Sequence, residues 1–273
     1  MLRAAARTGH IRLPALAVGR IFPHGSDVLI RFDEGGVLAV SLHDSYWARI
    51  LVGWEHEPDV RWVLDSALAY RPDAVLFDCG ANIGYWAARY AARVPVIAVE
   101  AVQPTYLRLV GNASRNGFQT IHAAVWDESG RPLTVQWNAA GEAAASVTQQ
   151  QGIRRCTVVS VTLDDLYHAG DVSGRLPIVK LDVEGAEVQA IDGARTMRDR
   201  TLWIYEDHGQ DRTHKVTAHF LQLGFKAFYA DGARLQQITC LGQLDKIKAD
   251  FSQGYNFIAL QADGPWGALP RLS

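Results

Sequence analysis

Residues 75–84, VLFDCGANIG, decide the fold. Apolar residues leading to Asp78, a turn of small residues and a further apolar run from Ile83 predict a strand, a tight glycine turn and a helix. Small residues let backbone N–H groups approach a ligand closely, and the unpaired N–H groups of the next helix point at the same place. A second apolar run, residues 96–99, ends in Glu100, where an acid can accept hydrogen bonds from ribose hydroxyls. The pair indicates a ligand that contains adenosine.

The composition is that of a globular protein, because 48% of the 273 residues are hydrophobic and a large core can form. A formal net charge of −2 gives no reason to expect nucleic acid as a partner. Three widely spaced cysteines argue against a disulfide scaffold or a zinc cluster and fit a cytoplasmic location. Residues 1–22 hold no apolar stretch of signal or spanning length, so we expect a surface segment and no membrane span. The oligomeric state stays open.

The chain is expected to consist of two parts. Residues 1–72 predict an N-terminal extension packed on a main domain formed by residues 73–273. In the extension, residues 28–42 predict a β-hairpin, and helical spacing follows until Pro72. Its three tryptophans are interpreted as helix core and contact surface rather than as the lining of a substrate entrance: Trp47, Trp54 and Trp62.

From Val75 onward strands and helices alternate, which predicts an α/β fold with a mostly parallel, doubly wound, Rossmann-like sheet. The expected strands are 75–79, 96–100 and 119–125, and the expected helices are 84–92 and 104–115. Residues 138–152 are small and polar and predict a mobile loop. The alternation then resumes with a strand that ends at Asp182, a helix opened by Glu184, a strand that ends at Glu206, a helix over 215–223 and two closing strands.

In such sheets ligands bind beyond the carboxyl ends of the strands, where strand order reverses. Asp78, Glu100, Asp182 and Glu206 are therefore expected to face one crevice. The turn lacks a third glycine and has Asn82 in place of the second, which disfavours a pyrophosphate. The Asp78 carboxylate would repel phosphates but could pair with an ammonium group. S-adenosylmethionine carries an adenosine, an amino-acid tail and no phosphate, so it fits better than NAD.

Five segments, taken in their order and spacing, are characteristic of one family: FDCGANIGYW, VEAVQPTYLRLVGNASRNG, AAVWDESG, TLDDL and VKLDVEGAEVQAIDGA. Together, from about Val75 to Glu206, they resemble the FkbM-type methyltransferases, S-adenosylmethionine-dependent enzymes with the class I Rossmann-like fold. The family often places Glu-Pro at the end of the second strand, whereas here Pro104 follows Glu100 only after three other residues. The ribose contact is expected to survive this change.

The resemblance implies roles for matching positions and an O-methyltransferase that acts on a hydroxyl of a sugar, polysaccharide or secondary metabolite. Asp182 would stand beside the transferred methyl group. The residues implied for the cofactor are Asp78, Gly80, Ala81 and Asn82 for the methionine part, Glu100 for the ribose, and Ala101 and Ala124 for the adenine.

Transfer to a poorly acidic hydroxyl needs a base. His208 is the first choice, because Glu206 and Asp207 precede it at a strand end and would stabilise its imidazolium form; Asp182 is the alternative. A second possible mechanism places a divalent metal such as Mg²⁺ on Asp182, Glu206 and Asp207, although no metal is required by the preferred mechanism. Rival functions are an N- or carboxyl-methyltransferase of the same fold, a non-catalytic adenosine-binding module and, less favoured, an NAD dehydrogenase.

Overall fold

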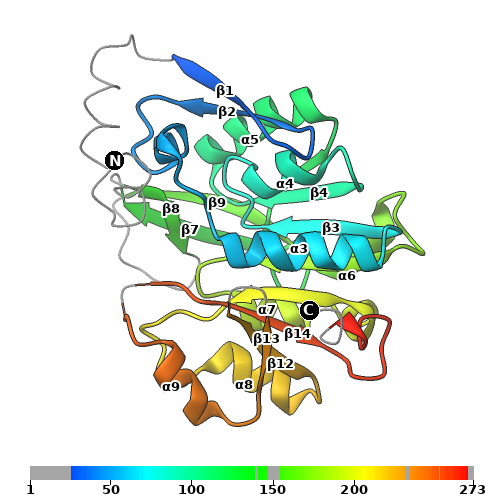
Figure 1. Ribbon diagram of the computed structural model, residues 1–273. Helices are drawn as coiled ribbons and strands as arrows, with labels where there is room; N and C mark the ends of the chain where they lie inside the picture. The colour runs from blue at the N-terminus through cyan, green and yellow to red at the C-terminus, as the bar shows by residue number, and fades with distance from the viewer. Residues whose placement is uncertain (1–25, 139–140, 147–153, 232–233, 252, 270–273) are drawn as a thin grey trace.

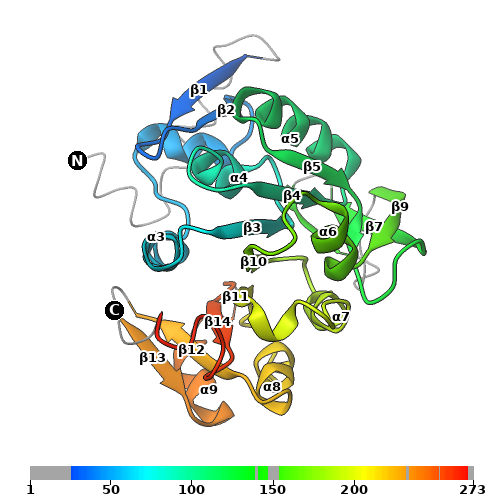
Figure 2. The same ribbon diagram turned by 90° about the vertical axis from the view of Figure 1, so that its right-hand side faces the viewer.

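The computed structural model describes residues 26–138, 141–146, 154–231, 234–251 and 253–269. Within this part of the chain the central sheet has eight strands in the order β13-β12-β14-β11-β10-β3-β4-β5. Figure 1 shows the whole molecule, and Figure 2 labels the strands of this sheet. The parallel strands are β5 (Gln119–His122), β4 (Val96–Glu100), β3 (Ala74–Cys79), β10 (Leu176–Leu181) and β11 (Leu202–Glu206). The antiparallel edge consists of β14 (Asn256–Leu260), β12 (Lys226–Ala230) and β13 (Leu235–Ile238). The predicted mostly parallel α/β sheet is confirmed.

Helices cover both faces of this sheet, and the strand residues alternate between them because side chains on a strand point to opposite faces in turn. In β3, Ala74 and Leu76 join one core while Val75 and Phe77 join the other. The first core is completed by α3 (Pro58–Tyr70), α4 (Tyr85–Tyr90) and α5 (Gln103–Asn116), and the second by α6 (Leu163–Ala169), α7 (Glu187–Asp192) and α8 (Lys215–Gln222) (Figure 2). Strands that are buried on both faces read as continuous apolar runs, which is what the sequence shows.

The path of the chain places a crevice at the centre of the sheet. From β3 the chain moves through β4 to β5 at one edge, and it later returns to β10, which lies on the other side of β3. The strand order therefore reverses between β3 and β10. A topological reversal of this kind leaves a crevice at the carboxyl ends of the strands, where ligands bind in open α/β sheets.

The predicted N-terminal hairpin is confirmed as β1 (Asp27–Arg31) and β2 (Val37–Ser41). Two asparagines of α5 fasten it: the backbone N–H of Ala39 donates to Asn112 Oδ1 at 2.8 Å, and that of Val37 to Asn116 Oδ1 at 2.8 Å. The helical stretch that follows is divided into a short 3₁₀ helix, η1 (Trp47–Val52), and α3. The division into an extension and a main domain remains a prediction, and residues 1–22 lie outside the described part.

A second sheet, in the order β6-β9-β7-β8, interrupts the alternation. It contains β6 (Ala124–Val125), β7 (Pro132–Asn138), β8 (Gly141–Ser146) and β9 (Arg154–Val161). The single strand predicted over 119–125 is therefore wrong: the N–H of Ala123 donates to the carbonyl of Glu100, and beyond this residue the chain pairs with β9 instead. The loop predicted over 138–152 begins at Asn138, the last residue of β7, and includes β8, so its prediction as a loop is wrong there; residues 139–140 and 147–152 lie outside the described residues. No helix in the described ranges is both long and apolar enough to cross a membrane.

Candidate active site

A pocket of about 870 Å³, its open mouth included, lies over the carboxyl ends of β3, β4 and β10. Seven of the eight residues predicted to hold the cofactor line it: Gly80, Ala81, Asn82, Glu100, Ala101, Ala124 and Asp182. The eighth, Asp78, is buried in β3 with 1% of its surface exposed. Residues that were not predicted as site residues complete the lining, among them Tyr46, His56, Tyr85, Trp86 and Lys180.

The glycine turn after β3 is shaped by contact with the segment after β10. Gly80 has a φ of +78°, and a Cβ built there would lie 1.7 Å from the carbonyl oxygen of Asp182. Only glycine permits both this backbone conformation and this approach. Asn82 also has a positive φ, 52°, and its Oδ1 accepts hydrogen bonds from the N–H of Ile83 at 2.8 Å and from Trp47 Nε1 at 2.9 Å. Trp47 is thus part of the core and also part of the pocket wall, so the interpretation as helix core and contact surface, rather than as the lining of an entrance, is incomplete for this residue.

Glu100 ends β4 and is held in place by two backbone N–H groups. Its Oε2 accepts from Asn82 at 2.9 Å and its Oε1 from Val102 at 2.7 Å. Burial nevertheless raises the pKa of Glu100 to about 7. The carboxylate is therefore fixed in orientation at the pocket wall. Part of its hydrogen-bonding capacity is already used by the N–H groups of Asn82 and Val102.

Asp78 lies beneath the glycine turn. Its Oδ2 accepts from the N–H of Ala87 at 3.0 Å, whereas its buried Oδ1 has no hydrogen-bond partner among the described residues. Burial raises the pKa of Asp78 to about 6, against the attraction of Lys180 in the neighbouring strand. A buried carboxylate oxygen without a donor favours a cationic or hydrogen-bonding ligand nearby.

Lys180 is the buried cation at the centre of the site. Its Nζ lies 2.7 Å from Asp182 Oδ2 and 3.8 Å from Glu57 Oε2, and only 3% of the residue is exposed. Burial opposes ionisation of Asp182, but the attraction of Lys180 outweighs it and holds the pKa of Asp182 below its usual value. The Lys-x-Asp spacing in the sequence puts these two side chains near each other, but nothing in the sequence indicated Glu57.

His56 stands between this ion pair and a group of aromatic rings. Its ring centroid lies 5.0 Å from that of Trp47 and 5.0 Å from that of Tyr85. Its Nδ1 is 3.4 Å from the hydroxyl of Tyr46, and its Nε2 is 3.4 Å from Glu57 Oε2. Sequence reasoning did not select His56, because its relation to β10 arises only when the loop before α3 folds over the strand ends.

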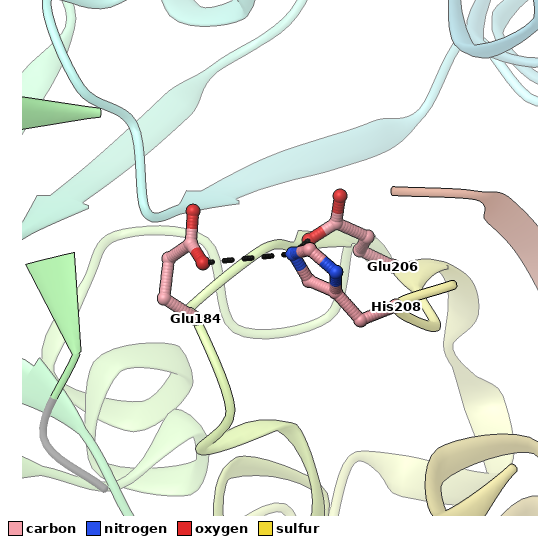
Figure 3. Close-up of side chains that lie close together, drawn as sticks. All are labelled: Glu184, Glu206 and His208. Carbon is pink, nitrogen blue, oxygen red and sulfur yellow. Dashed lines mark ion pairs between the residues drawn. The ribbon is translucent and has the colours of Figure 1, made fainter. Parts of the chain in front are cut away.

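The predicted base, His208, lies with Glu184 and Glu206 in a cluster that borders the pocket through Glu184, and Figure 3 shows these three side chains. His208 Nε2 is 3.9 Å from a carboxylate oxygen of each acid, and the three ligand-type atoms lie within 4.8 Å of one another. Burial, reinforced by Asp182, raises the pKa of Glu184 to about 8 and that of Glu206 well above its usual value. Of the three residues only Glu184 lines the pocket, and 42% of the His208 side chain is exposed.

Glu184 itself adopts a φ of 54°, so the helix predicted to open there starts at Glu187 instead.

Asp207 does not join this group, contrary to the expected metal set. Neighbouring residues in an extended chain point to opposite sides, so the side chain between Glu206 and His208 points away from them. Asp207 Oδ1 is 2.7 Å from Lys248 Nζ, and both side chains are fully buried. Its Oδ2 accepts from the backbone N–H and the hydroxyl of Thr217. The structure gives Asp207 a role in anchoring α8 rather than in the pocket.

Comparison with known proteins places this arrangement in a family. Residues 78–227 match the family model described as the methyltransferase FkbM domain. The chain is 28% identical over 190 residues to the hexuronic acid methyltransferase AglP of Haloferax volcanii, with 69% of this chain and 72% of the relative covered.

Two solved structures are also similar to the chain. One is precorrin-6y C5,15-methyltransferase from Geobacter metallireducens GS-15, with 12% identity, a TM-score of 0.44 and coverage of 76% of this chain and 88% of the other. The second is Aeropyrum pernix fibrillarin, with 11% identity, a TM-score of 0.41 and coverage of 87% and 84%. The match to the family model spans more than half of the chain, so the protein belongs to the FkbM methyltransferase family and is an S-adenosylmethionine-dependent methyltransferase.

Proposed function

We propose that the pocket over β3, β4 and β10 holds S-adenosylmethionine and that the protein methylates a hydroxyl group of a sugar or another glycan-like acceptor. The observation that carries the proposal is the position of Gly80, Glu100 and Asp182 in the wall of one pocket at the topological reversal. The pocket suits this cofactor, because the unpartnered oxygen of Asp78 beneath the glycine turn suits an ammonium group.

The order of the strands suggests how the cofactor would lie. Ala101 and Ala124 belong to the β4 and β5 side, and Gly80 follows β3, so the adenosine would lie toward the first pair and the methionine part toward the turn. When bound, the cofactor supplies an electrophilic methyl group on a positively charged sulfur. Asp182 and Glu184, on the β10 side, would then face the region where the acceptor enters.

We expect binding of S-adenosylmethionine to release protons near pH 7. The pKa values of Asp78 and Glu184 are raised to about 6 and about 8, mainly by burial. A cationic ligand favours the charged form of each acid and lowers these pKa values. The bound state therefore carries fewer protons, and the affinity rises as the pH increases from 6 to 8. Calorimetry in buffers of different ionisation enthalpy measures the number of protons released.

Two controls accompany this titration. S-adenosylhomocysteine lacks the sulfonium charge and should release fewer protons. The variant Glu184→Gln should reduce the pH dependence, because it removes one of the acids whose raised pKa lies within the assay range. Proton uptake on binding, or an affinity that falls with rising pH, would contradict the expectation.

The charges around the pocket favour a hydroxyl over a carboxylate as the acceptor. The curated relative is a hexuronic acid methyltransferase, and a hexuronic acid offers both hydroxyls and a carboxylate. Around the acceptor side of the pocket lie Glu57, Asp182 and Glu184, whereas Lys180 is the only lysine or arginine among the described residues that line the pocket. A neutral hydroxyl enters such surroundings at a lower electrostatic cost than a carboxylate does. Carboxyl methylation is the second candidate, because of the relative's substrate.

A metal is not needed for this reaction in our proposal. Two of the three oxygen ligands expected for Mg²⁺ are already neutralised by ammonium groups of the chain, Asp182 by Lys180 and Asp207 by Lys248. A divalent ion would have to replace both ion pairs, each of which includes a buried lysine. Dialysis against EDTA is therefore expected to leave the rate unchanged.

The test is release of S-adenosylhomocysteine across a panel of glucuronic acid, galacturonic acid and neutral hexose glycosides, before and after the EDTA treatment. Mild alkali then classifies the product, because a methyl ester is hydrolysed and a methyl ether is not. We expect an alkali-stable product. An alkali-labile product would support carboxyl methylation. Binding of S-adenosylmethionine without turnover of any acceptor would support a non-catalytic module.

A further inference from the structure

We propose that Tyr46, His56 and Glu57 form the proton-accepting group of the active site, with the hydroxyl of Tyr46 facing the acceptor and His56 receiving the proton. The proposal rests on the proposed function, since only a hydroxyl or similarly weak acid needs a base. It replaces His208 as the first choice, because Tyr46 and His56 line the pocket and His208 does not.

The hydrogen-bonding pattern defines the protonation of the imidazole. The Glu57 carboxylate 3.4 Å from Nε2 can only accept, so Nε2 carries the hydrogen of neutral His56. Nδ1 then presents its lone pair to the Tyr46 hydroxyl, 3.4 Å away. The same order of groups, an acid that orients an imidazole whose other nitrogen takes a proton, serves general-base catalysis in unrelated enzymes.

Glu57 is held by more than this contact. Its Oε2 accepts from Trp86 Nε1 at 3.2 Å and lies 3.8 Å from Lys180 Nζ. Its φ of 43° is one of four positive values at non-glycine residues in the described chain, and Asn82 and Glu184 in the pocket wall have two of the others. A backbone in this region costs free energy and persists where its surroundings impose it, which is common at functional sites.

Burial of His56 keeps it neutral and ready to accept a proton. Its surroundings contribute charged groups from three elements: Glu57 in the same loop, Arg49 in η1, and Lys180 and Asp182 at the end of β10. Burial is the largest influence and lowers the pKa of His56. The aromatic rings of Trp47 and Tyr85 exclude water from it. When the proton arrives, Glu57 compensates the charge of the imidazolium.

The reaction balances without another reactant. The acceptor oxygen bonds to the methyl carbon while the carbon–sulfur bond breaks and its electron pair stays on sulfur. The acceptor proton passes to the oxygen of Tyr46, and the proton of the Tyr46 hydroxyl passes to Nδ1 of His56. Burial and Glu57 raise the pKa of Tyr46, so the phenol transfers protons without remaining ionised. After the product leaves, the imidazolium of His56 transfers its proton to water.

The test compares His56→Gln and Tyr46→Phe with wild type and with His168→Gln, a matched control on α6 whose Nε2 contacts Thr196 Oγ1 at 3.1 Å. We expect affinity for S-adenosylmethionine, measured by calorimetry, to stay within about threefold, while kcat falls by about 10²–10⁴-fold in His56→Gln. The ascending limb of the kcat–pH profile should disappear in that variant. In Glu57→Gln it should move to lower pH, because loss of the carboxylate makes the imidazole less basic.

Full activity in His56→Gln, or a collapse of kcat in His208→Gln alone, overturns the proposal. Nitrogen NMR of the imidazole provides a readout that needs no acceptor: neutral His56 should carry its hydrogen on Nε2, and a hydrogen on Nδ1 overturns the proposal. If wild-type protein turns over no hydroxyl acceptor, the proposed function fails, while the NMR result still decides whether the three side chains are arranged as a proton-accepting group.

Discussion

Replacement of Lys248 by Met is expected to lower the free energy of unfolding by about 3–5 kcal/mol, because it leaves the buried Asp207 carboxylate without its counter-charge. Lys248 Nζ also donates to the carbonyl of Asp211 at 2.6 Å and contacts His214 Nδ1 at 3.1 Å. One ammonium group thus connects the chain after β11, the start of α8 and the residue that follows the short helix α9 (Leu244–Ile247). Chemical denaturation followed by circular dichroism measures the change.

The matched control is Lys246→Met, since Lys246 is exposed in α9, the helix that Lys248 follows, and its loss should have little effect. The double variant Lys248→Met with Asp207→Asn should be more stable than Lys248→Met alone, because no unpaired charge remains. Equal loss in Lys246→Met and Lys248→Met would show that the buried pair does not hold this part of the fold.

Replacement of Gly80 by Ala is expected to lower turnover by roughly 100-fold, the effect of a displacement of about 1 Å in an active site. The new Cβ would lie 1.7 Å from the Asp182 carbonyl oxygen, so the segment after β10 must move away from the turn after β3. That movement separates Asp182 from its place beside Lys180. The φ of +78° adds a cost of about 1–2 kcal/mol to stability. Steady-state kinetics and thermal unfolding measure the two effects.

The control variant Gly117→Ala distinguishes the steric clash at position 80 from the free-energy cost of placing alanine at a positive φ. Gly117 ends α5 with a φ of +77°, almost the same value, but no atom lies within 4 Å of a Cβ built there. This variant should lose similar conformational free energy and keep its turnover. If both variants keep full turnover, the contact between the two turns is not needed for activity.

Much of the fold could be predicted because each local signal agreed with the global arrangement. The apolar runs that became β3, β4 and β10 are buried on both sides, so they read clearly in the sequence. Pro104 near the start of α5 and Gly117 at its end marked that helix for the same local reasons. The predictions failed where partners came from elsewhere in the sheet, as for β6, whose pairing with β9 divides the strand expected over 119–125.

The candidate site also has a part that the sequence predicts and a part that only the tertiary structure shows. The sequence by itself determined the side proposed for the cofactor, because parallel strands joined by crossovers must bring Gly80, Glu100 and Asp182 to one edge of the sheet. Only the tertiary structure decided the side proposed for the acceptor. His56 and Glu57 precede Lys180 by more than 120 residues, and no periodicity or spacing relates a loop to the strand it covers. Likewise, Asp207 shares its sequence neighbourhood with Glu206, but the alternation of side chains gives it to Lys248 rather than to the pocket.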